Sequence, residues 1–377
     1  MIDIEALKED ISTPSLVVDK NTLQKNINKM SIFAKNNNIS IRPHAKSHKI
    51  PLISKLQIRE GAIGICVATL FEAEIMMKNN IHGILLTAPI TNKNDQNRLK
   101  IILQKSKQFC LVIDNIYSIN YLTEICSKNN LECNVLIDCD IMSIGKNKIG
   151  RTGARNIQEI LKLSQLVQSS SFLNYMGICA YAGDLQHINA FNSRHNEAKI
   201  RYQYLKKIID NLESKNLKPK IISGGGTGSH YMDTLSSLFT ELQPGSYIFG
   251  DVEYDNVDIY KSGNPYKPSL FVASSVISRI NEKKFIINAG LKAFSTDSKY
   301  LPKPSGNLPI GTQYNFMGDE HGLISLPAKS KKSLKLGETI LVQPPHCDPT
   351  INLYDQCNIY DRKKIREKWN IEARGYS

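Results

Sequence analysis

The chain has 377 residues, of which 41% are hydrophobic, so it can bury the core of one large domain and a smaller second one. Its net charge is +13, but the lysines are scattered among asparagines without an arginine-rich arm, which argues against a nucleic-acid partner. The eight cysteines form no CxxC pair, no apolar run reaches about 18 residues, and the first residues do not resemble a signal peptide, so we expect a cytoplasmic protein with no membrane contact.

Short apolar runs alternate with helical patterns through the first two thirds of the sequence. Apolar spacing predicts a helix over residues 21–38, and a strand over residues 39–46 follows it. Further strands are predicted at residues 64–70, 83–89, 109–115, 133–140, 175–183, 219–226 and 241–251, with helices at 50–61 and 71–80 and near Leu122, Ile160, Tyr202 and Leu235. About eight strand-then-helix units predict an α/β fold, a parallel (β/α)8 TIM barrel over residues 15–262.

The pattern changes after residue 262. Apolar runs at residues 269–280, 284–290, 321–329 and 339–345 are separated by short turns and lack helical spacing. This pattern predicts a mainly antiparallel β domain, which we assign to residues 1–14 and 263–377.

A cluster of basic residues ends the first predicted barrel strand. "RPHAKSHK" places His44, Lys46 and His48 at alternating positions, which share one face on a strand. Neighbouring positive charges lower one another's pKa, so a lysine held there can lose its proton and act as a nucleophile. Active sites of such barrels gather at this end of the strands. The alternative is a solvated basic loop before a helix.

Two glycine-rich loops follow late strands. Backbone N–H groups in such loops approach an anion closely, and the loops after the seventh and eighth strands form the phosphate site common in this fold. The residues are Ser223, Gly225, Gly226, Thr227 and Gly228 in the first loop, and Gly245, Ser246 and Tyr247 in the second. With a reactive lysine they indicate pyridoxal phosphate. Tight turns alone, or an aldolase for a phosphate-bearing sugar or keto acid, fit the same residues.

The segment "QPPHCDPT" offers a metal site in the second domain. On an extended segment His346 and Asp348 point the same way, and Cys347 points to the opposite side. An imidazole and a carboxylate on one face can hold a divalent cation and leave positions for water and substrate. Such a pair also occurs by chance.

Three more polar residues follow barrel strands. Tyr181 and His187 in "AYAGDLQH" can both face the mouth of the barrel, and Arg151 follows the preceding strand. A guanidinium there can meet a phenolate or a carboxylate. Arg151 and Tyr181 taken singly also fit ordinary surface and core positions.

The motifs together resemble a known family. "TPSLVVD", "RPHAKSHK", "GICVATLFEAE", "SGGGTGSH", "LQPGSYIFGD" and "PPHCDPTINLYD" resemble the D-threonine aldolase and eukaryotic-type D-serine dehydratase family, fold-type III pyridoxal phosphate enzymes related to alanine racemase. The resemblance runs from about Thr13 to Asp355. It implies that the lysine bonded to the cofactor is Lys46, that the other cofactor contacts are His44, Arg151, Tyr181 and the glycine-rich loops, that the base is His187, and that the metal ligands are His346 and Asp348.

The resemblance implies a carbon–carbon lyase that cleaves D-β-hydroxy-α-amino acids to glycine and an aldehyde. Dehydratases of the family tend to carry Cys where this chain has Asp348, and an oxygen ligand suits Mn²⁺ or Mg²⁺ better than Zn²⁺. A D-serine or D-3-hydroxyaspartate dehydratase, an amino-acid racemase and a non-catalytic carrier of the cofactor remain as alternatives. Related folds pair, so we also expect a homodimer.

Overall fold

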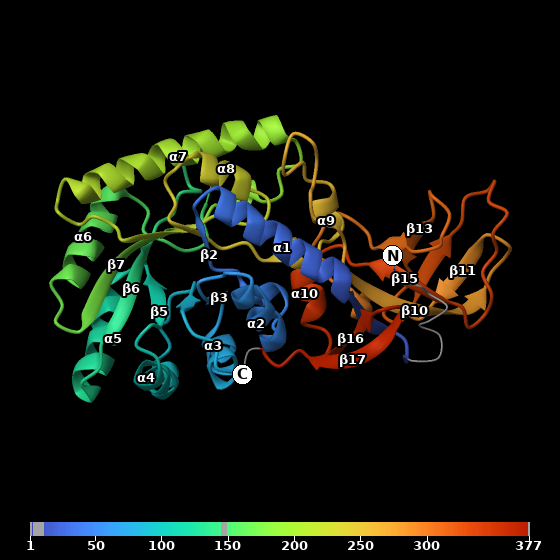
Figure 1. The fold of residues 1–377 in the computed structure, drawn as a ribbon, viewed down its shortest axis with the longest axis horizontal. Coiled ribbons are helices and arrows are strands. Elements are labelled where there is room, and N and C mark those ends of the chain that lie inside the picture. Colours follow the sequence, from blue (N-terminus) through green and yellow to red (C-terminus); the bar gives the residue numbers. More distant parts are fainter. Residues whose placement is uncertain (1, 3–10, 145–148, 376–377) are drawn as a thin grey trace.

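The computed structural model describes residue 2 and residues 11–144 and 149–375 (Figure 1). Within these residues the chain builds two sheets, one of eight and one of nine strands. The first sheet and its helices occupy one end of the molecule, and the second sheet extends from the other end.

The eight-stranded sheet is parallel and curls toward closure. Its order is β2-β9-β8-β7-β6-β5-β4-β3, and a backbone bridge between His44 and Cys66 links its two ends. The apolar runs form buried strands because helices cover the sheet from outside. The strands are β2 (Ser40–Ile41), β3 (Ile65–Val67), β4 (Ile84–Leu86), β5 (Cys110–Ile113), β6 (Cys133–Asp138), β7 (Leu173–Ala180), β8 (Ile221–Gly224) and β9 (Glu241–Leu242). The predicted barrel is confirmed.

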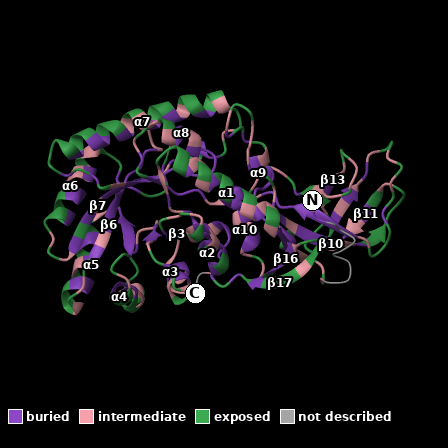
Figure 2. Ribbon diagram, in the orientation of Figure 1, coloured by how far each residue is buried: buried purple, intermediate pink, exposed green. Residues whose placement is uncertain are grey.

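The outer helices bury one face each, as Figure 2 shows. In α1, Leu23, Ile27 and Met30 are buried at helical spacing while the opposite side meets solvent. The helices are α1 (Lys20–Asn36), α2 (Pro51–Arg59), α3 (Leu70–Lys78), α4 (Gln96–Lys105), α5 (Ile116–Asn129), α6 (Ile157–Gln168), α7 (Phe191–Glu213), α8 (His230–Leu235) and α9 (Val252–Asp255). No helix in the described part of the chain has the length and apolar character required to span a bilayer.

The second sheet is antiparallel apart from one pair, β1 with β16. Its strands are β1 (Ser15–Asp19), β10 (Leu270–Arg279), β11 (Lys284–Ile287), β12 (Lys303–Ser305), β13 (Gln313–Phe316), β14 (Gly322–Ser325), β15 (Thr339–Gln343), β16 (Gln356–Asp361) and β17 (Lys364–Asn370). The predicted boundary at residue 15 is wrong for β1, because this strand pairs with β10 and β16 and not with the barrel.

Short helical segments connect these elements. They are η2 (Ala45–Ser47), η3 (Lys93–Asp95), η4 (Gly183–Leu185), η5 (Ser246–Ile248), η6 (Leu291–Ala293) and α10 (Cys347–Ile351). Helix α10 follows β15 of the second sheet and lies against η2, which follows β2 of the barrel. The end of the barrel therefore meets the second sheet at these two segments.

Candidate active site

A cavity of about 610 Å³ lies at the C-terminal ends of the parallel strands. Loops after β2, β6, β7, β8 and β9 line it, together with α10. Of the residues predicted from the sequence, the lining includes His44, Lys46, Arg151, Tyr181, His187, Gly226, Thr227, Gly245, Ser246, His346 and Asp348. Motifs that lie up to about three hundred residues apart thus converge on one space.

Lys46 lies on the 3-10 turn η2 and not on a strand. Pro43 has no backbone N–H, so the ladder of β2 is interrupted before the turn. The ring of His44 accepts a hydrogen bond from the Lys46 N–H, at 3.4 Å, and starts the turn. The predicted shared face is therefore wrong: His44 and Lys46 line the cavity, whereas His48 is buried elsewhere.

The charge of Lys46 also differs from the prediction. Its Nζ atom lies 3.5 Å from Oδ2 of Asp348, and this carboxylate raises the pKa of Lys46 although burial lowers it. Burial holds the pKa of His44 well below its ordinary value and brings that of His48 to about 3. Both rings are therefore neutral near pH 7. The predicted lowering by neighbouring cations is wrong because the nearest charge is negative.

His346 and Asp348 lie at the start of helix α10. His346 is the residue before the helix and Asp348 is in its first turn, so the segment is not extended as predicted. Burial raises the pKa of Asp348, but the positive charges of Lys46 and His346 outweigh it and bring the value to about 2. Ser246 donates a hydrogen bond to Oδ1 of Asp348, at 3.1 Å. The backbone N–H of the buried Cys347 donates to Asp251.

Two histidines and two further carboxylates surround this helix start. Nδ1 of His346 lies 2.7 Å from Oδ2 of Asp297, and Nδ1 of His187 lies 3.5 Å from Oε2 of Glu253. The two imidazole rings are 6.3 Å apart. Burial lowers the pKa of both histidines, and for His346 the carboxylates, with Asp348 first, raise it above the ordinary value.

The donor set at α10 suits a cation with two protein ligands. An imidazole held by a carboxylate and a second, ionised carboxylate are the groups that bind divalent metals. Among the residues that the structure describes, no three His, Cys, Asp or Glu side chains form a group that could hold a metal. A cation at His346 and Asp348 would therefore take its remaining ligands from water and substrate.

Backbone N–H groups of two opposite loops form a polar surface of the cavity. Within the described residues, the N–H groups of Thr227, Gly245 and Ser246 donate to no other backbone or side-chain group, whereas that of Gly226 donates to Asp233. All four residues line the cavity, and unpaired N–H groups are costly unless water or a ligand accepts from them. This surface fits a phosphate group, and Lys46 in the same cavity fits the aldehyde of pyridoxal phosphate.

Arg151 and Tyr181 form one wall of the cavity. The guanidinium carbon of Arg151 lies 5.5 Å from the centre of the Tyr181 ring, which is within the range of a cation–π contact. Part of the chain before Arg151, residues 145–148, lies outside the described residues. Arg151 thus lies beside Tyr181, and its predicted contact with the cofactor stays a prediction.

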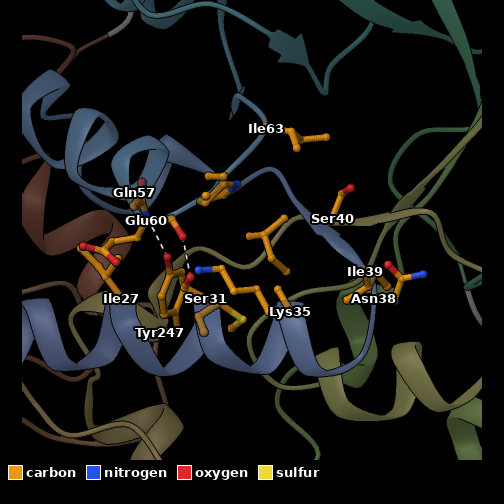
Figure 3. Close-up of a pocket in the computed structure, with 16 residues that line it drawn as sticks. Ile27, Ser31, Lys35, Asn38, Ile39, Ser40, Gln57, Glu60, Ile63 and Tyr247 are labelled. Atoms are coloured by element: carbon orange, nitrogen blue, oxygen red, sulfur yellow. Dashed lines mark hydrogen bonds between the residues drawn. The ribbon is translucent and has the colours of Figure 1, made fainter.

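Two predicted cofactor residues point away from the cavity. The hydroxyl of Ser223 donates to Glu241 inside the barrel, at 2.7 Å. The side chain of Tyr247 lies in a separate cavity of about 350 Å³ between α1, β2 and α2, where its hydroxyl accepts from Gln57 at 3.0 Å (Figure 3). The Tyr247 backbone still contacts the first glycine-rich loop, because its N–H donates to the hydroxyl oxygen of Thr227.

Two predicted glycines serve packing. Gly225 has a φ of +67°, and a Cβ there would meet Asp233 at 2.5 Å. The N–H of Gly228 donates to Oε1 of Gln186 at 2.9 Å and is thus already paired. Neither glycine lines the cavity.

Several polar residues at the site were missed in the sequence. Asp138 ends a predicted strand in "VLID", which is the position where barrel enzymes carry site residues, so that signal was available. Glu253 lies a few residues after the second glycine-rich loop, so its position after a barrel strand could have indicated it in the same way. Asp297 has no local signal, because only the folded second sheet brings it to His346.

Comparisons with known proteins agree with this geometry. The family model of the alanine racemase N-terminal domain matches residues 18–253, and that of a putative serine dehydratase domain matches residues 269–360. A 3-hydroxy-D-aspartate aldolase of Paracoccus denitrificans is 30% identical over 99% of this chain and 96% of its own. The chain belongs to the D-threonine aldolase and D-serine dehydratase family.

Two further members of the family allow the chain to be compared with an aldolase and with a dehydratase. The crystal structure of a D-threonine aldolase from Filomicrobium marinum is 30% identical, with a TM-score of 0.90 over 97% of this chain and 96% of that chain. A D-serine dehydratase of Dictyostelium discoideum is 25% identical over 76% of this chain and 75% of its own length. The resemblance to the aldolases is therefore higher in identity and more complete.

Proposed function

We propose that the chain is an aldolase that depends on pyridoxal phosphate and a divalent metal and cleaves D-β-hydroxy-α-amino acids to glycine and an aldehyde. The observation that carries the proposal is the 3.5 Å separation of the Lys46 amine from the Asp348 carboxylate within one cavity. One small amino acid, with its amino group toward Lys46 and its β-hydroxyl toward α10, can reach both. The substrates would be of the D-threonine or D-3-hydroxyaspartate type.

The barrel side would hold the cofactor. Lys46 would bond to pyridoxal phosphate and give it up to the substrate amine, and the cofactor would then supply an electron sink for negative charge on the substrate α-carbon. The free N–H groups of Thr227, Gly245 and Ser246 would donate hydrogen bonds to its phosphate. Arg151 and Tyr181 would flank the ring from their wall of the cavity, and the neutral His44 beside Lys46 would contact it without adding charge.

The residues at and near helix α10 would hold the metal and transfer the proton of the β-hydroxyl. A Mn²⁺ or Mg²⁺ ion at His346 and Asp348 would supply Lewis-acid polarisation of the β-hydroxyl. His187, oriented by Glu253 and neutral because burial lowers its pKa, would take the β-hydroxyl proton. Cleavage of the Cα–Cβ bond then releases the aldehyde, and protonation of the α-carbon yields glycine.

A D-amino acid dehydratase is the second candidate, because the same cavity could use Lys46 to remove the α-proton. Purified protein loaded with pyridoxal phosphate and Mn²⁺ should be incubated with D-threonine, D-3-hydroxyaspartate and D-serine. We expect glycine and an aldehyde from the first two, and no glycine in excess EDTA. A keto acid and ammonia instead would assign the chain to the dehydratases.

We further infer a cytoplasmic homodimer. The second sheet and its loops expose Ile280, Ile310 and Leu336, which a second copy would cover. All eight cysteines are buried and free, as in a reducing compartment. Sedimentation at micromolar concentration should give twice the mass of the chain, and a monomer would contradict the dimer.

A further inference from the structure

One buried side chain joins the two loops that face the cavity from neighbouring strands. Residues 181–187 follow β7 and end in His187, and residues 226–228 follow β8 and carry the free N–H group of Thr227. Between them lies Gln186, which is 1% exposed and does not line the cavity itself. It is therefore placed to connect proton transfer with anion binding.

The amide of Gln186 makes hydrogen bonds to both loops. Its Nε2 atom donates to the carbonyl of Ala182, at 3.1 Å, and to the hydroxyl of Ser229, at 2.8 Å. Its Oε1 atom accepts from the backbone N–H of Gly228, at 2.9 Å. The Ser229 hydroxyl donates onward to Asp233, so the connection continues into α8.

The loop of residues 226–228, which we call the phosphate loop, has glycines that leave space for this amide. A Cβ at Gly226 would lie 2.6 Å from Oε1 of Gln186, and a Cβ at Gly228 would lie 2.2 Å from its backbone oxygen. A Cβ at Gly228 would collide with backbone, so only glycine fits there, and a Cβ at Gly226 would require the Gln186 amide to shift. The two loops thus pack against each other at Gln186, and movement of one displaces the other.

The His187 segment has weak hydrogen bonds of its own. Its backbone bonds from Leu185, Gln186 and Ile188 span 3.2–3.4 Å, at the long end of the normal range. From outside, Arg201 on α7 pairs with Asp184, and Arg194 donates to the carbonyl of Ile188. On the side of this segment that faces the phosphate loop, the hydrogen bonds come from the side chain of Gln186.

We propose that Gln186 is a positioning residue that couples occupation of the anion-binding N–H groups to the placement of His187. An anion at the N–H of Thr227 fixes the phosphate loop, and the Gly228–Gln186 bond transmits that order to the next residue, His187. The part of this inference that concerns catalysis rests on the proposed role of His187 as the base. The coupling itself does not depend on any reaction.

The coupling is tested by hydrogen exchange of the full-length protein without cofactor, with inorganic phosphate as the probe. Inorganic phosphate carries only the anionic group that these N–H groups would bind, so no other part of the cofactor contributes to the protection. In the native protein we expect phosphate to slow exchange at residues 224–230 and also, by about threefold or more, at residues 181–188. In Gln186→Met the second region should lose this protection.

Gln203→Met is the matched control, because Gln203 is an exposed glutamine on α7 that lies outside the candidate site. It should behave like the native protein. If Gln186→Met does not fold, Ser229→Ala removes one partner of the amide and should give a partial loss. Equal protection of residues 181–188 in native protein and variant would overturn the proposal.

A second readout separates positioning from general stability. Gln186→Met should lower kcat about tenfold with little change in KM, but less than about twofold when His187 is already alanine. The same factor in both backgrounds would contradict coupling through His187. If the native protein makes no glycine, the proposed function fails while the exchange experiment still decides whether Gln186 couples the loops.

Discussion

Two carboxylates, one buried and one partly buried, line the same cavity from opposite parts of the molecule and differ in charge. Asp138 ends strand β6 of the barrel, and burial, with Asp114 and Asp140 nearby, raises its pKa to about 7 although Thr152 donates to it. Asp348 starts helix α10 after the second sheet, and its pKa is about 2. Burial acts in the same direction on both, so the difference comes from their partners.

The comparison shows where the cavity keeps negative charge. Asp348 faces the cations Lys46 and His346, whereas the cation nearest to Asp138, that of Arg151, has only a small effect. Near pH 7 Asp348 is therefore fully ionised and Asp138 only partly so. An ionised carboxylate beside an imidazole is an arrangement that divalent cations favour, which supports the proposed metal site at α10.

Replacing Lys46 should have the largest effect on this arrangement. Lys46→Ala removes both the group that bonds to pyridoxal phosphate and the cation that faces Asp348, so turnover should fall by roughly four orders of magnitude. The purified variant should lack the visible absorption band of a lysine-bound cofactor, whereas Lys55→Ala, at an exposed position on α2, should keep it. A yellow Lys46→Ala protein would refute the assignment.

Exchanging the two carboxylates for amides compares them directly. Asp348→Asn should lower kcat by about two to three orders of magnitude, because the cation loses its charged ligand, while the cofactor stays bound. Asp138→Asn should cost less than about tenfold. Steady-state rates with saturating Mn²⁺, together with the visible spectrum of each variant, give the comparison. Equal losses in the two variants would mean that the charge difference between them has no role.

The carboxylate behind His346 should have an intermediate effect. Asp297→Asn removes the partner 2.7 Å from Nδ1 and leaves the imidazole less well oriented. The Kd for Mn²⁺ should rise about 10- to 100-fold in a calorimetric titration. The exposed Asp319, also in the second domain, supplies the control variant Asp319→Asn, which should bind Mn²⁺ like the native protein. An unchanged Kd in Asp297→Asn would place the metal elsewhere.

The effect with the least bearing on turnover concerns stability and pH. Since the folded protein holds the proton of Asp138 up to about pH 7 and the unfolded chain loses it near pH 4, stability should fall as pH rises between these values. A difference of about three pKa units corresponds to a loss on the order of 4 kcal/mol. Asp138→Asn should reduce the slope of urea-unfolding free energy against pH, and Asp210→Asn, on the exposed side of α7, should not. If the slope in Asp138→Asn equals that of the native protein, the raised pKa of Asp138 is contradicted.

The sequence predicted the barrel, the antiparallel second part and eleven of the 24 residues that line the cavity. Alternating apolar runs specify parallel strands, and their C-terminal ends meet at one edge, which is why Lys46, Gly226 and Thr227 could be placed together. The prediction that Lys46 has a lowered pKa was wrong, because the carboxylate that raises it lies 302 positions away in the sequence.

The remaining errors have a similar origin. Strand β1 reads like a barrel strand, and only its pairing with β10 and β16 assigns it to the second sheet. The glycines of the phosphate loop indicated an anion, but Gly225 and Gly228 are needed for contacts with Asp233 and Gln186. Local sequence patterns identify residues whose side chains or backbone could bind a ligand or react. Tertiary contacts decide which of these residues face the ligand.

The central claim is that Lys46 and the pair His346 and Asp348 act on the same small molecule. Crystals of the protein with pyridoxal phosphate and Mn²⁺ should be measured at a wavelength where manganese scatters anomalously. We predict a peak about 2.0–2.3 Å from a ring nitrogen of His346 and an oxygen of Asp348, within the cavity that holds Lys46. A manganese peak elsewhere, with Asp348 still paired to Lys46, would contradict the account.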